Sequence, residues 1–246
     1  CYPATLIVGD IVKAFKEGRY DPEQTAVAIT QTGGQCRASN YISLIKRALT
    51  EAGFGQTPVV SVSFSSGLRN EQPGFRINWF RLIPVVLNAL LFSDSIAKLY
   101  YAAAVREKVS GEAFRLKERY LRKAQSVIER NASHELLPLL EQAVNEFERI
   151  TQSGERPRVG IVGEIYLKFN PFAQKNLTEW LVGQGIEVVP PLLTDFFMQS
   201  FVNQIVNQDS GVVRKQLPDT LIRWLYSRVW KRVEKFNRIG KAYPYF

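Results

Sequence analysis

The stretch Ala26-Val-Ala-Ile-Thr30, followed by Gln31-Thr-Gly-Gly-Gln-Cys-Arg-Ala-Ser-Asn40, decides the fold that we expect for this chain. Its first five residues form an uncharged run of strand length, and a loop with two adjacent glycines follows. An amphipathic helix with Ile45 and Leu49 on its apolar face comes next, and residues 58–64 read as a second strand. Strand, helix and strand over this distance predict a βαβ unit with parallel strands and a right-handed crossover.

A second stretch near the C-terminal end has the same outline. Residues 158–163 predict a strand, residues 164–175 are mostly loop, and a helix to about Val182 leads to a strand at 186–189. Between the two stretches, residues 77–151 have a helical pattern. We therefore predict an α/β fold with two Rossmann-like parallel βαβ lobes and a helical segment between them. The expected domains are 1–75 with the cysteine loop, 76–153 with the helices, and 154–246 with a basic C-terminal helix.

Composition places the chain among ordinary globular proteins, since 46% of its 246 residues are hydrophobic and 22% are charged. Its most apolar stretch, Leu82 to Ser93, is well short of the roughly 20 residues that a bilayer requires, so we expect no membrane span. Two cysteines do not make a disulfide framework, which favours a reducing, cytoplasmic location. The start at Cys1-Tyr-Pro, without Met, suggests an internal fragment of a longer protein.

The loop around Cys36 is the strongest candidate site. It leaves the carboxyl end of a predicted strand, which is the edge where open α/β sheets bind ligands. Paired glycines let the backbone approach a ligand closely, and N–H groups at a helix start attract anions and favour a thiolate. The loop is neither a P-loop nor G-x-G-x-x-G. The alternative is a simple turn beside a small buried cysteine. The expected binding residues are Gly33, Gly34, Gln35, Arg37, Ser39 and Asn40.

Glu164 is a second candidate, because it directly follows a predicted strand and Gly163. Its carboxylate would act as a general base or an orienting acceptor, and Lys168 and Asn170 would face the same cleft as Cys36 if both units share one sheet edge. The alternative is a solvated loop with local hydrogen bonds. His134, the single histidine, is expected to face solvent, which argues against a Ser–His–Asp machine or a histidine metal site.

Positive charge is concentrated at the C-terminal end. Residues 211–246 hold nine Lys or Arg and two acidic residues, a net charge of +7, which leaves +2 of the total of +9 for the rest. The last helix has an apolar stripe and a basic side. Such a helix can pack on a core with its charges solvated, or it can lie on an anionic membrane. It can also bind nucleic acid, an acidic partner lobe or a CoA phosphate. Core packing is the commonest of these, and nucleic acid is not the expected partner.

Three segments of the chain form a recognisable set: Cys1-Tyr-Pro-Ala4, Thr30-Gln-Thr-Gly-Gly-Gln-Cys-Arg-Ala-Ser-Asn-Tyr41 and Val159-Gly-Ile-Val-Gly-Glu-Ile-Tyr-Leu-Lys-Phe-Asn170. Together they resemble the activase-related branch of the 2-hydroxyacyl-CoA dehydratase family. The resemblance implies an iron–sulfur lobe for low-potential electron transfer or acyl-CoA dehydration. It also implies that Cys1 and Cys36 are metal ligands, and that the partners are the remaining domains of the parent protein, with an ATPase activator part, and an acyl-CoA.

A 4Fe–4S cluster takes three or four cysteine thiolates, and this chain has two. The other ligands would come from outside the fragment, so we expect the cluster in the intact protein and not in this segment alone. No phosphate-binding signature is found, so ATP hydrolysis is not expected here. The alternative function is a non-catalytic Rossmann-like binding or interaction module in which the cysteines are structural.

Overall fold

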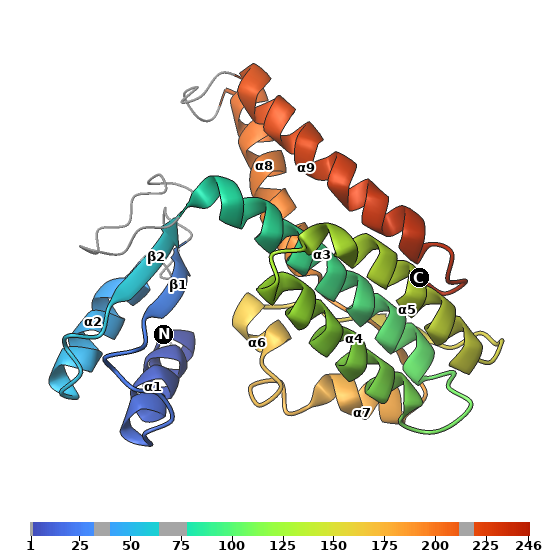
Figure 1. The fold of residues 1–246 in the computed structure, drawn as a ribbon, viewed down its shortest axis with the longest axis horizontal. Helices are drawn as coiled ribbons and strands as arrows, with labels where there is room; N and C mark the ends of the chain where they lie inside the picture. Colours follow the sequence, from blue (N-terminus) through green and yellow to red (C-terminus); the bar gives the residue numbers. More distant parts are fainter. Residues whose placement is uncertain (1, 32–39, 64–77, 212–218) are drawn as a thin grey trace. The chain divides into compact units, whose positions relative to one another are not determined.

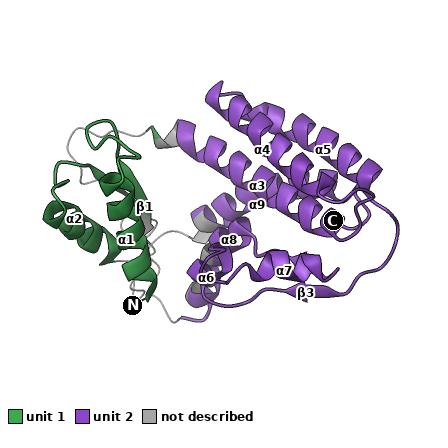
Figure 2. Cartoon of the chain, turned by 90° about the horizontal axis from the view of Figure 1, so that it is seen from below, with its two compact units in different colours: residues 1–78 green, residues 79–246 purple. Residues whose placement is uncertain are grey.

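The computed structural model describes residues 2–31, 40–63, 78–211 and 219–246. The chain divides into two compact units, Cys1–Asn78 and Trp79–Phe246, which Figure 2 shows in two colours. Most of the described residues are helical, and each unit contains one small parallel sheet of two strands. The fold is therefore mixed α/β, as predicted.

The first unit is built around one strand–helix–strand element. Helix α1 (Tyr2–Lys16) precedes β1 (Val27–Gln31), α2 (Tyr41–Glu51) and β2 (Val59–Ser63). The two strands pair in parallel, with Val27 opposite Val59 and Gln31 opposite Ser63. This is the pairing that the sequence predicts for residues 26–64.

Packing of the two helices on this sheet forms a small core. The buried side chains are Phe15, Ile45, Leu49 and Val59, and the Phe15 and Phe54 rings lie 5.5 Å apart. Gly53 follows α2 with a φ of +89°, a backbone conformation that glycine adopts without steric cost. The apolar face of α2 is thus the one expected from its sequence period.

Helices dominate the second unit. Helix α3 (Trp79–Ala104) packs against α4 (Glu112–Glu129) and α5 (Leu136–Ile150), and α9 (Asp219–Gly240) covers α3 and α5 (Figure 1). A short 3-10 turn, η2 (Ser133–Glu135), precedes α5, so Pro138 falls in the first turn of the helix, where proline is tolerated. The shared core includes Phe92, Ile96, Leu99, Tyr120, Leu140, Phe147 and Phe236.

The rest of the second unit carries the other sheet. Strand β3 (Arg158–Gly160) is followed by α6 (Ile165–Phe169), α7 (Leu177–Gly183), β4 (Glu187–Val189) and α8 (Leu193–Asp209). β3 and β4 pair in parallel, and α3 contacts both β4 and α8. The predicted segments 76–153 and 154–246 therefore lie in one compact unit. Because each sheet has two strands among the described residues, a Rossmann-like lobe stays a prediction.

Helix α3 is long and apolar enough, by length and composition alone, to cross a membrane over Arg81–Ala104. This window extends beyond the stretch Leu82 to Ser93 on which the expectation of no membrane span was based. The central helix of a soluble core passes the same test, and Phe92, Ile96 and Leu99 are fully buried against neighbouring helices. This packing is consistent with a soluble unit.

Replacement of Gly240 by Ala is predicted to destabilise the second unit. A methyl group at this buried position, the last of α9, would overlap the ring of Phe246, which packs against the core. We expect Gly240→Ala to lower the free energy of unfolding by about 1–3 kcal/mol, as overpacking does. Chemical denaturation followed by circular dichroism measures this change.

Gly9→Ala is the matched control, because no atom lies within 4 Å of the added methyl group in α1. There the substitution should be neutral or stabilise the helix by about 0.5–1 kcal/mol. A Gly240→Ala variant as stable as the Gly9→Ala variant would contradict the contact with Phe246.

Candidate functional site

The cysteine loop joins β1 to α2 in the first unit. Of its predicted binding residues, Asn40 is described; the others, Gly33, Gly34, Gln35, Arg37 and Ser39, lie outside the described residues, as do the predicted metal ligands Cys1 and Cys36. Asn40 is the N-cap residue of α2, is exposed, and makes no side-chain hydrogen bond to the helix start. Its amide therefore does not complete the first turn of α2.

The order of β1, the loop and α2 along the chain shows at which edge of the sheet this loop begins. The chain leaves β1 at Gln31, which pairs with Ser63 at the carboxyl end of β2. It enters α2 at Tyr41. The loop thus starts from the carboxyl edge of a parallel pair, where ligands of α/β sheets bind.

Glu164 caps a short helix in the second unit. Its carboxylate accepts a hydrogen bond from the Leu167 N–H at 3.2 Å, and the side chain is exposed. Asn170 is also locally bonded, since its Oδ1 accepts from the Ala173 N–H at 2.9 Å and its Nδ2 donates to Tyr166 Oη at 2.8 Å. Lys168 is exposed. These contacts are the local hydrogen bonds that the alternative reading of this loop expects.

The predicted metal ligands, Cys1 and Cys36, lie outside the described residues. Within residues 2–31, 40–63, 78–211 and 219–246, no three His, Cys, Asp or Glu side chains come together as a metal site. The two cysteines alone fall short of the three or four thiolates of a 4Fe–4S cluster. This chain by itself does not supply a complete ligand set.

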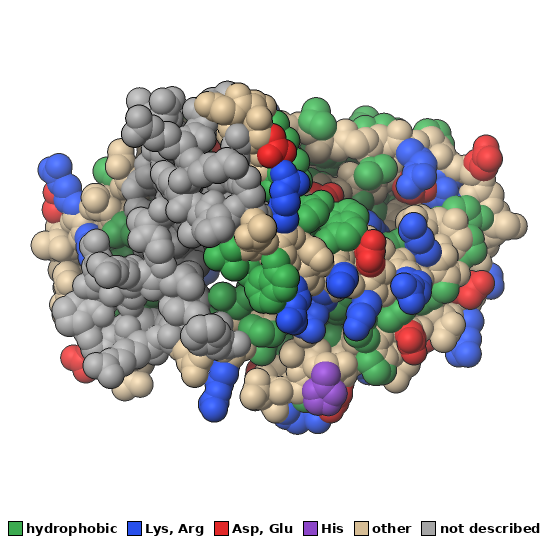
Figure 3. Space-filling view, turned by 90° about the horizontal axis from the view of Figure 1, so that it is seen from above, with side chains coloured by type: hydrophobic (Ala, Val, Ile, Leu, Met, Phe, Trp, Pro, Cys, Tyr) green, Lys and Arg blue, Asp and Glu red, His purple; other side chains and the backbone are tan. Residues whose placement is uncertain are grey.

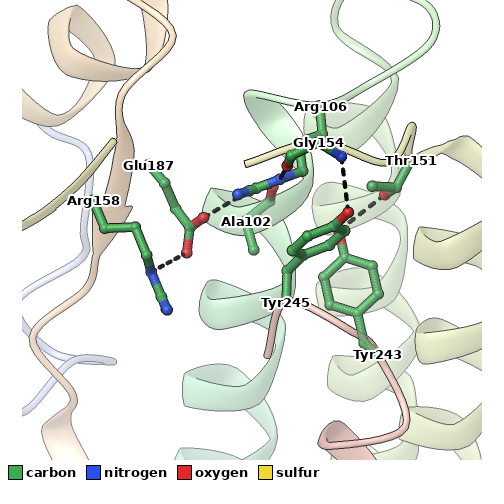
Figure 4. A network of polar contacts seen from close by, with 8 residues as sticks. All are labelled: Ala102, Arg106, Thr151, Gly154, Arg158, Glu187, Tyr243 and Tyr245. Carbon is green, nitrogen blue, oxygen red and sulfur yellow. Dashed lines mark hydrogen bonds and ion pairs between the residues drawn. The ribbon is translucent and has the colours of Figure 1, made fainter. Parts of the chain in front are cut away.

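A buried ion pair that no local sequence pattern predicts joins the residues just after α3 to β4. Arg106 Nη1 is 2.6 Å from Glu187 Oε2, and both side chains are 3% exposed (Figure 4). Arg158, in the neighbouring strand, reaches the other carboxylate oxygen with its Nε at 2.9 Å. The guanidinium of Arg106 also donates to the carbonyls of Gly154 and Ala102, both at 2.8 Å. The buried guanidinium thus contacts a carboxylate and two carbonyl acceptors, and the buried carboxylate contacts two arginines.

Two tyrosines from the C-terminal residues complete this network. The Tyr245 ring lies 4.1 Å from the Arg106 guanidinium, and its hydroxyl accepts the Gly154 N–H at 3.0 Å. The Tyr243 hydroxyl is 2.9 Å from Thr151 Oγ1, and burial raises the pKa of Tyr243 to about 12. Arg106 and Glu187 are buried with every charge partnered, and the surrounding contacts join the segments around them, so the geometry of this network is that of a structural contact.

A second polar cluster surrounds a cavity of about 90 Å³ between α3, α8 and α9. Asp94 accepts the Leu193 and Thr194 N–H groups at 3.2 and 2.8 Å, which caps the start of α8. Burial raises the pKa of Asp94 and lowers that of Lys98, whose Nζ is 3.4 Å from Asn237 Oδ1. Asp94 and Lys98 stand four residues apart in an apolar helix, a spacing that places both on one face and is visible in the sequence. Their contacts hold α8 and α9 on α3.

A wider trough of about 760 Å³ lies along α4 and α5. Its walls carry charges of both signs, and an ion pair between Arg119 and Glu146 crosses it. The charged lining residues are Glu112, Arg115, Glu118, Arg119, Arg122, Glu146 and Arg149. With both signs mixed, this face has no clear preference for an anion or a cation.

Comparisons with known proteins leave the family open. No protein-family model, curated protein or solved structure matches this chain. The relation to 2-hydroxyacyl-CoA dehydratases therefore stays a resemblance carried by the three segments quoted above.

Removal of the buried carboxylate is predicted to be strongly destabilising. Glu187→Gln leaves Arg106 buried without an opposing charge, and breaking such a pair lowers the free energy of unfolding by about 3–5 kcal/mol. Arg158→Gln is the control, because its side chain is 58% exposed and its contact with the same carboxylate should contribute at most about 1 kcal/mol. Urea denaturation of both variants measures the difference. Equal losses in the two variants would contradict the assignment of Arg106–Glu187 as the dominant contact.

Alkaline pH is predicted to weaken the second unit through its buried tyrosines. The pKa of Tyr243 rises from 10.0 to about 12 on burial, so folding favours the neutral phenol. This contribution to stability is complete below pH 10 and is lost as the pH rises through about 12. The free energy of unfolding should fall over this interval, and less steeply in Tyr243→Phe. Denaturation at several pH values tests this, and an equal slope in both proteins would refute it.

Proposed function

We propose that this chain is the iron–sulfur lobe of a 2-hydroxyacyl-CoA dehydratase- or activase-related protein of the cytoplasm. In the intact protein it would serve low-potential electron transfer or acyl-CoA dehydration, together with further domains that include an ATPase activator part. The observation that carries this proposal is the parallel β1–α2–β2 element, whose connecting loop, residues 32–40, contains Cys36. Paired glycines, a thiol and a helix start in that loop suit a ligand at the sheet edge.

The role proposed for this chain is to supply two thiolates and backbone donors. N–H groups at the start of α2 lower the pKa of a nearby thiol and so favour the thiolate, which is the form that ligates iron. Cys36 would be held by the loop, and Cys1 by the start of the chain beside α1. The remaining ligands would come from other parts of the intact protein or from another subunit, since one-electron chemistry at low potential requires the full set.

A second candidate is a non-catalytic Rossmann-like module that binds a partner or a small anion, with structural cysteines. The contacts of Glu164 favour it, because its carboxylate caps α6 and is already engaged with the Leu167 N–H. A group that satisfies its own helix is a poor general base. In this case the loop around Cys36 would only shape the end of the sheet.

Iron binding by the full-length protein separates the two candidates. We expect anaerobic reconstitution of the wild type to give bound iron and an EPR signal on reduction. Cys36→Ala should lose most of both, because one thiolate ligand is removed. Thr32→Ala, in the same loop but outside the expected binding residues, is the matched control and should keep the iron. Equal iron in the wild type and Cys36→Ala, or none in either, would refute a cluster at Cys36 and favour the binding module.

A further inference from the structure

One face of α9 carries a row of exposed side chains that are apolar at one end and basic at the other. These residues recur at spacings of three and four, which places them on one side of the helix. We call them the outer row: Leu221, Trp224, Leu225, Arg228, Lys231, Arg232, Lys235 and Arg238, all of them exposed. The opposite side of α9 is buried, with Val233 and Phe236 in the core.

Helix α8, which packs against α9, also exposes apolar side chains. Trp224 is 52% exposed and Leu221 is 42% exposed, while Val202 and Val206 of α8 are 42% and 52% exposed. A pair of hydrogen bonds from Arg223 Nη2 to the Asp209 carboxylate, each 2.9 Å long, joins the two helices here. Two connected helices thus present large apolar side chains to solvent, and clusters of this kind mark interaction sites.

The basic end of the outer row is not neutralised. In the part of the chain that is described, Lys231, Lys235 and Arg238 form no ion pair with Asp or Glu, and Glu234 accepts instead from the Trp230 indole at 2.9 Å. Arg228 lies 4.8 Å from the Trp224 ring, and Arg232 donates to Asn88. Figure 3 shows Lys and Arg side chains close to hydrophobic ones on the side of the molecule seen from above. The outer row is therefore complementary to an anionic surface.

We propose that the outer row and the adjoining end of α8 dock on an anionic lipid bilayer. Leu221, Trp224 and Leu225 would enter the interfacial layer, where Trp side chains are favoured. The five basic residues would contact lipid phosphates, as clusters of Lys and Arg on an amphipathic helix do. This association is peripheral, is separate from any span by α3, and does not depend on the iron–sulfur proposal.

Lipid fits the outer row better than a nucleic acid does. Duplex DNA is bound through phosphates and leaves no role for a protruding apolar end of Leu and Trp. A bilayer surface accepts both parts of the row at once, because apolar chains lie directly beneath its charged headgroups.

Vesicle flotation of residues 1–246 tests the proposal. We expect binding to equimolar phosphatidylglycerol and phosphatidylcholine vesicles, at least tenfold weaker binding to pure phosphatidylcholine, and release at high salt. The triple variant Lys231→Gln, Lys235→Gln and Arg238→Gln should bind on the order of a hundredfold more weakly, since each basic residue near the surface contributes about fivefold. Exposed substitutions of this kind leave the fold intact, which circular dichroism checks.

The matched control removes three exposed cations from the trough on α4 and α5: Arg115→Gln, Arg122→Gln and Arg149→Gln. It changes the net charge equally and should keep most of the binding. Trp224→Ala should also weaken binding, and Trp224→Phe should restore it while reducing the blue shift of Trp emission that vesicles cause.

Three results would overturn the proposal. The first is no binding to anionic vesicles, and the second is an equal loss in both triple variants, which would indicate a response to net charge alone. The third is binding of a DNA duplex at moderate salt with no binding to vesicles, which would assign the outer row to nucleic acid. A result on vesicles leaves the iron measurement on Cys36 unaffected, so the two proposals fail independently.

Discussion

The buried pair of Arg106 and Glu187 is the interaction on which the second unit depends. Arg106 stands just beyond the end of α3, and Glu187 begins β4, so their contact ties the helical core to the small sheet. Removing two charges from water is expensive unless each finds an opposite charge and its hydrogen bonds are satisfied. Here Arg158 and the carbonyls of Gly154 and Ala102 meet that requirement, which also fixes the position of the segment that leads into β3.

The C-terminal residues follow from the same constraint. Tyr245 covers the Arg106 guanidinium, Tyr243 reaches Thr151 at the end of α5, and Phe246 packs beside Gly240. The chain therefore turns back immediately after α9 and holds the end of that helix against the core. Because the end is held there, the buried side of α9 carries Val233 and Phe236 and its other side faces outward. The direction in which the outer row faces thus depends on the contacts of Tyr243, Tyr245 and Phe246, which lie beyond the end of α9.

Local patterns predicted the elements, and longer-range contacts decided how they combine. The uncharged run before Gln31 and the apolar face with Ile45 and Leu49 were enough to predict the parallel pair in the first unit. The separation of residues 76–153 from 154–246 was drawn from the polar stretch around Gln152, but that stretch runs alongside Arg106 and both sides share one unit. Contacts such as Arg106 with Glu187 join residues 81 positions apart, and no local period reports them. The place of Glu164 after a strand predicts a group in a cleft, while its partner in the structure, the Leu167 N–H, lies three residues ahead and follows from ordinary helix capping.

Ion pairs within the described residues give no account of the charges of Lys231, Lys235 and Arg238 on α9. Like charges three or four residues apart on a helix oppose folding by a few tenths of a kcal/mol per pair. Lys231, Lys235 and Arg238 are spaced in this way, and within the described residues no acidic partner offsets them. The buried side of α9 would pack equally well with neutral residues opposite it, since Val233 and Phe236 contact the core from the other face. The outer row therefore weakens its own helix and leaves Trp224 exposed to water. This arrangement is consistent with binding to an anionic surface, which would replace the repulsion among the cations with attraction.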